Sequence, residues 1–152
     1  MPDIIISDTS CLILLSKMNM ISFLTTVYGK VLVTEIVAQE FGEPLPSFIE
    51  IRKLTNTSNF TILEQEIDTG EASSIALALE VPNSTLLLDD KKARKMALKL
   101  NLPFTGLVGV FVQAKKRGKI SNVKTYLESL KSAGMWISEK LFVQILKDVN
   151  ES

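Results

Sequence analysis

The sequence predicts an α/β fold in which helices cover a parallel sheet. Short apolar runs that suit strands alternate with segments of helical periodicity over most of the 152 residues, as is typical of a parallel sheet. The first run, Ile4–Ile6, consists of β-branched residues and suits a strand buried on both faces. The chain contains no internal repeat and no linker, so residues 1–152 are predicted to form one domain.

A polar turn and a helix follow this first strand. Asp8 comes directly after the strand, at the carboxyl end where open α/β sheets place their ligands. Thr9 or Ser10 is expected to cap a helix over Cys11–Lys17. Asp8 is also a residue type common at turns and helix caps, so at this point a structural role and a functional role both stay open.

The next third of the chain mixes short apolar runs with turn signals. Thr34 is expected to cap a helix that ends at Gly42, because glycine is favoured just past a helix end. The elements expected between residues 31 and 63 are a strand at Val31–Thr34, helices at Glu35–Phe41 and Ser47–Leu54, a loop at Thr55–Asn59 and a short strand at Phe60–Leu63.

Helical and extended segments alternate regularly in the second half. A helix after Gly70 is well marked, since Ala72, Ile75, Ala76 and Leu79 follow the i, i+3, i+4, i+7 pattern. The remaining expected elements are strands at Thr85–Leu88 and Pro103–Thr105, and helices at Ala93–Leu100, Val108–Lys115, Val123–Leu130 and Leu141–Val149.

The composition excludes several kinds of active site. The chain has no histidine and a single cysteine, Cys11, which falls on an apolar stretch and is predicted to be a small core residue. A Ser-His-Asp or Cys-His nucleophilic site is therefore excluded, and so is an ordinary structural zinc site. Any metal ligands must be mostly oxygen atoms, which indicates Mg²⁺ or Mn²⁺.

Charge and hydropathy indicate a globular protein without a global basic field. The 17 basic and 17 acidic residues give a net charge of zero, so any nucleic-acid contact must use local patches. No apolar run approaches the roughly 20 residues of a membrane helix, and the first residues lack the pattern of a secretion signal. We therefore expect a cytoplasmic protein with no membrane partner.

Acidic residues follow two of the apolar strands. Asp8 follows the first, and Asp89 with Asp90 follows Thr85–Leu88. Because the carboxyl ends of parallel strands share one edge of the sheet, these acids are expected to be neighbours. Glu40 and Glu71 occupy helix positions that can face the same edge.

Clustered carboxylates repel one another, and a divalent cation relieves that repulsion. Such a site suits hydrolysis of a phosphodiester, because the cation activates water and stabilises charge on phosphate oxygens. Taken singly, each acid also has a structural explanation. Glu71 suits a helix dipole, Glu40 an exposed helix surface, and Asp89 or Asp90 a helix cap. Together with the absence of histidine, the pattern favours a metal site.

Basic residues form two clusters that are candidates for phosphate contacts. The first follows the acidic pair and comprises Lys91, Lys92, Arg94, Lys95 and Lys99, and the second comprises Lys115, Lys116, Arg117 and Lys119. Solvated helix surfaces have the same composition, which is the interpretation we favour for most of these residues. Arg94 is singled out because it lies one turn beyond Asp90. No aromatic series accompanies the clusters, so base stacking has no support.

Several motifs, in this order, resemble those of PIN domains over roughly Ile4 to Leu146. These motifs are Ile6–Ser10, Gly70–Ala72, Leu88–Asp90 with Ala93-Arg94 and Ala97, and Thr105–Gly109 with Ala114-Lys115. The resemblance is greatest to an uncharacterised branch of the family related to the VapC-type toxin ribonucleases. The chain departs from those toxins at Leu88-Asp89-Asp90, where they usually carry a Thr-x-Asp pattern.

The resemblance implies a three-layer α/β/α sandwich with a central parallel sheet, and a Mg²⁺- or Mn²⁺-dependent ribonuclease. Carried over by position, the catalytic acids are Asp8, Glu40, Glu71, Asp89 and Asp90. Of these, all but Glu40 are the expected metal ligands, with Asp90 favoured slightly over Asp89. The residues expected to contact substrate are Ser10, Lys91, Lys92 and Arg94. The implied partners are RNA, a cognate antitoxin protein and a second copy of the chain in a homodimer.

Three hypotheses about function follow from these observations. The leading one is a metal-dependent ribonuclease that acts as the toxin of a toxin–antitoxin module. The alternative is a non-catalytic PIN-fold module that binds RNA or a protein. An aspartyl-phosphate protein is disfavoured, because Ser10 stands where the phosphatases need a second acid and because the acidic pair follows a late strand.

Overall fold

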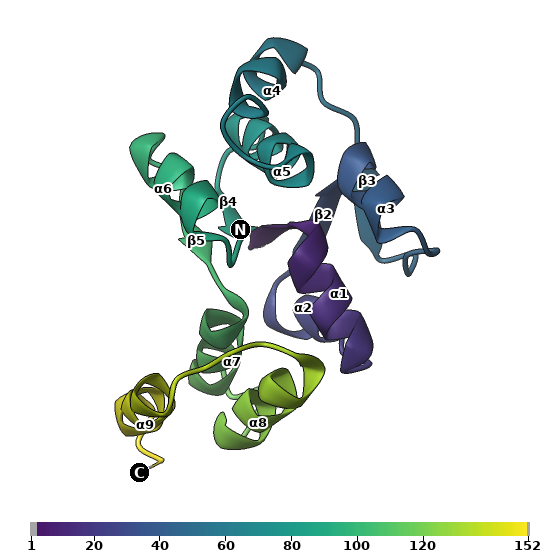
Figure 1. Ribbon diagram of the computed structural model, residues 1–152. Coiled ribbons are helices and arrows are strands. Elements are labelled where there is room, and N and C mark those ends of the chain that lie inside the picture. Colours follow the sequence, from purple (N-terminus) through teal and green to yellow (C-terminus); the bar gives the residue numbers. More distant parts are fainter. Residues whose placement is uncertain (1–2, 152) are drawn as a thin grey trace.

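The computed structural model describes residues 3–151, in which a five-stranded parallel sheet is flanked by helices (Figure 1). Residues 1–2 and 152 of the predicted domain lie outside this range. The strand order is β3-β2-β1-β4-β5. The strands are β1 (Ile4–Ser7), β2 (Lys30–Thr34), β3 (Ile49–Arg52), β4 (Ser84–Leu87) and β5 (Phe104–Thr105).

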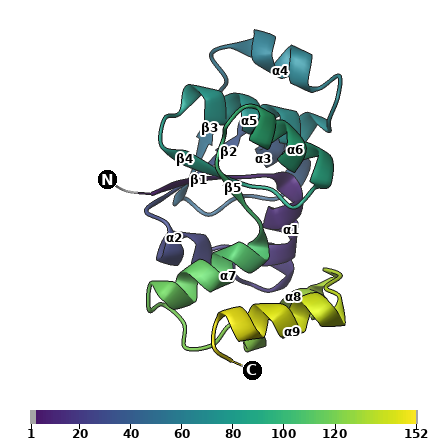
Figure 2. The ribbon, with the colours of Figure 1, turned by 90° about the vertical axis from the view of Figure 1, so that its left-hand side faces the viewer.

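Helices cover both faces of the sheet, which confirms the predicted three-layer α/β/α sandwich. Figure 2 shows α4, α5 and α6 above the sheet and α2, α7, α8 and α9 below it. The helices are α1 (Thr9–Lys17), α2 (Phe23–Val27), α3 (Glu35–Phe41), α4 (Thr57–Leu63), α5 (Thr69–Glu80), α6 (Lys91–Lys99), α7 (Leu107–Lys116), α8 (Lys124–Ala133) and α9 (Glu139–Asp148).

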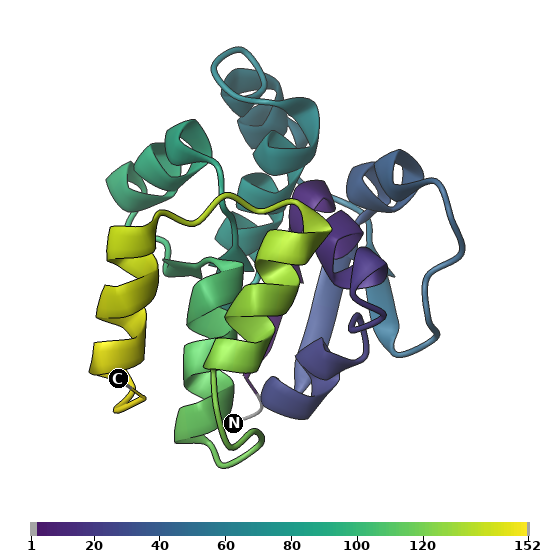
Figure 3. The same cartoon turned by 60° about the horizontal axis from the view of Figure 1, so that its bottom comes forward.

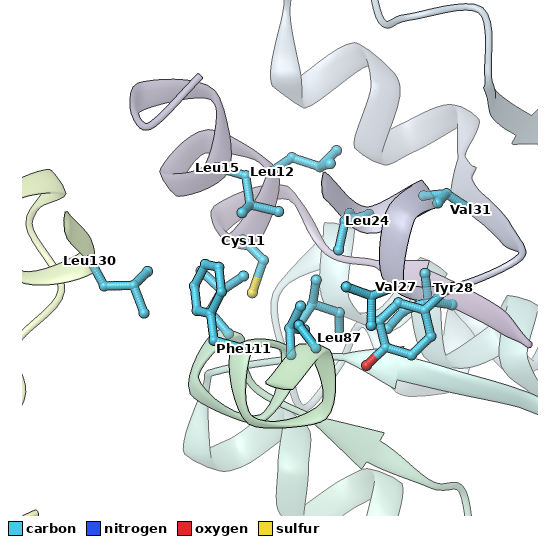
Figure 4. Close-up of a cluster of buried hydrophobic side chains, with 14 of the residues drawn as sticks. Cys11, Leu12, Leu15, Leu24, Val27, Tyr28, Val31, Leu87, Phe111 and Leu130 are labelled. Atoms are coloured by element: carbon cyan, nitrogen blue, oxygen red, sulfur yellow. The ribbon is translucent and has the colours of Figure 1, made fainter. Parts of the chain in front are cut away.

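The central strands carry apolar residues on both faces because successive side chains enter opposite cores. Ile5 packs into the core formed with α1, α2, α7 and α8, whereas Ile6 packs against α5 and α6. In β4, Leu87 packs into the same core as Ile5, and Leu86 packs into the same core as Ile6. Figure 4 shows part of the first core, in which Cys11 lies among apolar side chains. Cys11 is fully buried, as predicted.

The order in which strands are added to the sheet reverses between β1 and β4. From β1 the chain proceeds to β2 and β3 on one side, and it then returns to add β4 and β5 on the other side. The crevice outside the carboxyl ends of two such strands is where open α/β sheets bind ligands. Ser7 pairs with Leu87, and the Asp8 N–H donates to the Leu87 carbonyl at 3.2 Å. Asp8 is thereby fixed beside the residues that follow β4.

Two predicted elements are wrong, and one helix was not predicted. The expected helix Ser47–Leu54 contains strand β3 instead, because its residues pair with β2, as Ile51 does with Val33. The expected strand Phe60–Leu63 is part of helix α4, which begins within the expected loop. Asn56 starts this helix by accepting a hydrogen bond from the Ser58 N–H at 3.0 Å. The short helix α2 had no signal in the periodicity.

The last three helices lie on one face of the sheet. Figure 3 shows α9 (yellow) and α8 (lime) on either side of α7 (green), and their apolar residues belong to the core on the side of the sheet opposite α5 and α6. Apolar residues of all three helices contribute to the first core, among them Phe111, Leu127 and Ile145. Within residues 3–151, none of the helices combines the length and the apolar composition needed to cross a bilayer.

Candidate active site

Asp8 is both a helix cap and the most deeply buried of the predicted site residues. One of its carboxylate oxygens accepts the Cys11 N–H at 2.9 Å, and the other accepts the Ser10 hydroxyl at 3.2 Å. Asp8, and not Thr9 or Ser10 as expected, is therefore the N-cap of α1. Burial raises the pKa of Asp8 above its ordinary value, although the hydrogen bonds from Cys11 and Ser10 act in the opposite direction.

Glu40 lies in the last turn of α3, and its carboxylate rests against the start of α5. Its Oε1 atom accepts the Thr9 hydroxyl at 2.5 Å. A Cβ atom added at Gly70 would stand 2.2 Å from the same Oε1 and 3.1 Å from the Thr9 hydroxyl. Only the absence of a side chain at Gly70 leaves room for this carboxylate.

Glu71 stands in the first turn of α5, where several acids surround it. Burial is the largest cause that raises the pKa of Glu71, to about 7, and repulsion by Asp90, Asp8, Asp68 and Glu40 adds to it. An ionised Glu71 would add a further negative charge to this group of acids. Its ionisation is therefore costly.

Two adjacent pockets contain these acids. The first, of about 360 Å³, is lined by Asp8, Thr9, Ser10, Ile13, Glu40, Asp68, Thr69, Gly70 and Glu71. The second, of about 400 Å³, is lined by Glu64, Gln65, Glu66, Ile67, Asp68, Glu71, Asp90 and Lys92. Asp68 and Glu71 belong to both. Among the described residues that line either pocket, Lys92 is the one basic side chain.

Asp89 and Asp90 face different surroundings. Asp90 caps α6 by accepting the Ala93 N–H at 3.0 Å, and it lines the second pocket with Glu71. Asp89 instead points towards the start of α7, where its Oδ2 accepts the Leu107 N–H at 3.3 Å. The Cys11 thiol donates to the same oxygen at 3.3 Å. Burial raises the pKa of this thiol well above its ordinary value, so it acts as a neutral donor.

Arg94 contacts Asp89 and not the pockets. Its Nη2 atom lies 3.0 Å from the Asp89 Oδ1, its Nε donates to the Leu88 carbonyl at 2.7 Å, and its guanidinium stacks over Phe104. Gly106 accommodates the pair, since a Cβ there would lie 2.2 Å from the Arg94 Nη2. The structure therefore places Arg94 in a packed network next to the site.

The other predicted substrate contacts lie at or near the crevice. Ser10 lines the first pocket and donates to Asp8. Lys92 lines the second pocket, whereas Lys91 is exposed at the start of α6 and lines neither. Sequence reasoning did not select Asp68, which precedes α5 but does not cap it through its side chain. Its position directly before a helix that begins with Thr69-Gly70-Glu71 is the signal that could have identified it.

The chemistry of the donor set fits a hard divalent cation, although the carboxylates do not meet at one point. All candidate ligands are carboxylate oxygens. The pKa of Glu71 is raised first by burial and then by repulsion from the neighbouring acids, and a cation would relieve that repulsion. In residues 3–151, however, no three acidic or cysteine side chains lie close enough together to form a complete metal site. The residues that would hold Mg²⁺ or Mn²⁺ are Asp8, Glu71 and Asp90, with Asp89 next to them.

The fold and the crevice define an α/β protein with acidic residues gathered at the switch point of a parallel sheet. A sequence-family model described as a PIN domain matches residues 4–151, and the chain therefore belongs to the PIN domain family. PIN domains are in general metal-dependent nucleases, so the fold is of the nuclease type. No curated protein and no solved structure shows a significant match to the chain.

Proposed function

We propose that the protein is a metal-dependent ribonuclease that hydrolyses phosphodiester bonds, and that it is the toxin of a toxin–antitoxin module related to the VapC type. The observation that carries the proposal is the group of acids around Glu71, which stand at the switch point of the sheet without a matching set of basic residues. Asp8, Glu71 and Asp90 would hold Mg²⁺ or Mn²⁺, with Asp89 as a further candidate and Glu40 as a fifth catalytic acid.

A bound cation would supply an activated water and would stabilise negative charge on the phosphate oxygens. The chain's own residues prepare the site for it. Asp8 is held by its cap hydrogen bonds, so its carboxylate keeps one orientation. Because the pKa of Glu71 is about 7, a proton and a cation compete for this carboxylate near neutral pH.

RNA is the proposed substrate, and Lys92 is the side chain best placed to receive it. Lys92 lines the pocket that contains Glu71 and Asp90, so its ammonium group can attract a phosphate to the acids. Lys91 is exposed beside it, while Ser10 adds a hydroxyl at the other pocket. Arg94 acts on substrate only if it leaves Asp89. A cognate antitoxin, a homodimer and a cytoplasmic location complete the proposal.

The proposal is tested with the Asp8→Asn variant. Asparagine is as good an N-cap as aspartate, so the variant is expected to fold while losing the charge that a cation needs. We expect Asp8→Asn to abolish Mn²⁺-dependent RNA cleavage in vitro and growth arrest on expression, with an unchanged circular dichroism spectrum. Asp148→Asn, in α9 outside both pockets, is the matched control and should cleave normally. Undiminished cleavage by Asp8→Asn would remove Asp8 from the mechanism.

One observation favours a second candidate, a PIN-fold module that binds RNA or a protein without cleaving. In the part of the chain that the structure describes, the acids share a crevice but form no complete metal site. Isothermal titration with Mn²⁺ separates the two candidates. A catalytic site should bind Mn²⁺ and lose it in Asp8→Asn, whereas a binding module should give no heat of binding in either protein.

A further inference from the structure

Two buried hydroxyl groups join the helices that carry Glu40 and Glu71. Thr34 ends β2 and caps α3, and Ser73 lies in the second turn of α5. Their oxygen atoms are 2.7 Å apart, and the two residues are 1% and 0% exposed. They are 39 residues apart in the sequence, so this contact exists only in the folded chain.

The neighbouring hydrogen bonds show which of the two hydroxyl groups is the donor. The Val37 N–H donates to the Thr34 hydroxyl oxygen at 3.0 Å, and the Ser73 hydroxyl donates to the Gly70 carbonyl at 2.7 Å. A hydroxyl has a single proton to donate. Since Ser73 gives its proton to Gly70, Thr34 must be the donor to Ser73. One continuous chain of hydrogen bonds therefore runs from the first turn of α3 to the first turn of α5.

The Gly70 end of this chain is next to two acids of the crevice. Gly70, which accepts the last hydrogen bond, is the residue against which the Glu40 carboxylate rests, and Glu71 is the next residue. A shift of α5 relative to α3 would therefore change the gap between the Glu40 and Glu71 carboxylates. The hydroxyl chain opposes such a shift, because separating the helices would leave the Thr34 donor buried without an acceptor.

We propose that Thr34 and Ser73 are positioning residues that hold Glu71, a proposed ligand of the divalent cation, at a fixed spacing from the proposed catalytic acid Glu40. The inference rests on the proposed function, because it concerns the geometry of that site. Neither residue lines either of the two acidic pockets. Their effect is transmitted through the backbone of α3 and α5.

Ser74 provides a matched control next to Ser73. It is also fully buried in α5, and its hydroxyl also donates to the Gly70 carbonyl, at 3.1 Å. The hydrogen bond of the Ser74 hydroxyl stays within α5, whereas the Ser73 hydroxyl also contacts Thr34 in β2. Ser73→Ala and Ser74→Ala therefore remove the same atom from neighbouring buried positions, and only the first breaks the link between the two helices.

The test measures Mn²⁺ affinity by isothermal titration, and kcat and KM for RNA, in Ser73→Ala, Ser74→Ala and Thr34→Ser. We expect Ser73→Ala to weaken Mn²⁺ binding on the order of ten-fold, as is usual when a group that orients a metal ligand is removed. Its kcat should fall while KM for RNA stays near the wild-type value, because the basic residues are untouched. Ser74→Ala and Thr34→Ser, which keep the link, should behave like the wild type.

The outcomes separate the inference from the function on which it rests. Wild-type Mn²⁺ affinity in Ser73→Ala would overturn the positioning role alone, and so would an equal loss in Ser74→Ala, because that loss would be a general effect of altered packing in α5. A wild-type protein that binds no Mn²⁺ would overturn the proposed function, and the positioning role would fall with it. If Ser73→Ala fails to fold by circular dichroism, Thr34→Val breaks the same link together with the α3 cap, and wild-type Mn²⁺ affinity in that variant would overturn the positioning role.

Discussion

Several residues of the crevice have a structural duty as well as a candidate functional one. Asp8 and Asp90 each cap a helix with one carboxylate oxygen, and each also borders a pocket that contains Glu71. A capping hydrogen bond fixes the side chain and still leaves the carboxylate charged. The two interpretations that the sequence left open for these acids are thus compatible, because an anchored carboxylate is better placed to bind a cation than a mobile one.

Glu71 leads to a prediction about pH. Its pKa is raised from the ordinary 4.5 to about 7, so the folded state favours the protonated acid. The stabilising effect of protonated Glu71 is therefore complete below pH 4.5 and is lost as the pH rises towards 7. We expect the free energy of unfolding of the metal-free protein to fall over this range, and to fall less in Glu71→Gln, as measured by urea denaturation.

The control for this prediction is an acid far from the crevice. Glu128→Gln, on the exposed side of α8, should leave the pH dependence of stability unchanged. Mn²⁺ should bind more tightly to the wild type at pH 8 than at pH 6, because the cation needs ionised Glu71. Parallel pH profiles for the wild type and Glu71→Gln would contradict the raised pKa.

Gly70 leads to a second prediction at the scale of one residue. Alanine is a better helix former than glycine by about 1 kcal/mol, so Gly70→Ala should not destabilise α5 as a helix. Its Cβ would nevertheless lie 2.2 Å from the Glu40 Oε1, which must move away. We expect Gly70→Ala to stay folded in thermal melts but to cleave RNA more slowly, with Thr61→Ala in α4, outside both acidic pockets, as the control. Unchanged RNA cleavage by Gly70→Ala would show that the place of Glu40 is unimportant.

At the scale of elements, the two central strands β1 and β4 are each followed by one or two acids and then by the N-terminus of a helix. β1 leads through Asp8 into α1, and β4 leads through Asp89 and Asp90 into α6. The dipoles of the two helices favour negative charge at these positions. The acids are therefore stabilised one by one by their own helices, and the repulsion between them remains for a cation to relieve.

Two substitutions of Asp90 separate its role as the cap of α6 from its proposed role as a metal ligand. Asp90→Asn keeps an oxygen that can cap α6, so stability should be retained while Mn²⁺ affinity and cleavage fall. Asp90→Ala loses the cap as well and should lower the free energy of unfolding by about 1 kcal/mol more than Asp90→Asn does. Urea denaturation and Mn²⁺ titration measure the two effects separately. Equal stability of the two variants would mean that the cap contributes nothing.

At the scale of the whole molecule, one side chain near the end of the chain ties the last helices together. Glu151 Oε2 lies 2.8 Å from the Lys115 Nζ in α7 and accepts the Val123 N–H at 2.6 Å, while its Oε1 accepts the Lys124 N–H at 3.0 Å. α8 has no cap from its own N-cap side chain, so Glu151 supplies the acceptors instead. These hydrogen bonds and the Lys115 charge hold the pKa of Glu151 below its ordinary value, despite its partial burial.

From these contacts we predict that substitution of Glu151 lowers the stability of the protein without changing its affinity for Mn²⁺. Glu151→Ala leaves the Val123 and Lys124 N–H groups at the start of α8 without their acceptor and should lower the free energy of unfolding by about 1–3 kcal/mol. Hydrogen exchange in α8 should become faster, while Mn²⁺ affinity stays that of the wild type. Asp148→Asn, which alters an exposed contact with Gln144 in α9, should have little effect. Unchanged exchange in α8 would contradict the capping role.

Much of the fold follows from local patterns in the sequence. Ile4–Ile6 and Thr85–Leu88 are recognisable as buried strands because both faces of a parallel sheet are apolar, and the helix after Gly70 is recognisable by its period. The short segments in the middle could not be assigned in this way. Ile49–Arg52 becomes a strand because it pairs with β2, and Thr57–Leu63 becomes a helix because Asn56 caps it, neither of which the apolar pattern reveals.

By itself, the sequence determined the class of fold, the all-oxygen donor set and the strand ends from which the acids project. These depend on residue type and on short-range spacing, which the chain carries locally. Only the tertiary structure decided that Asp90 shares a pocket with Glu71 while Asp89 turns to Arg94, and that Asp68 joins the group. The reason is physical, because the direction of a side chain at the end of a strand is set by the partners that other elements bring to it.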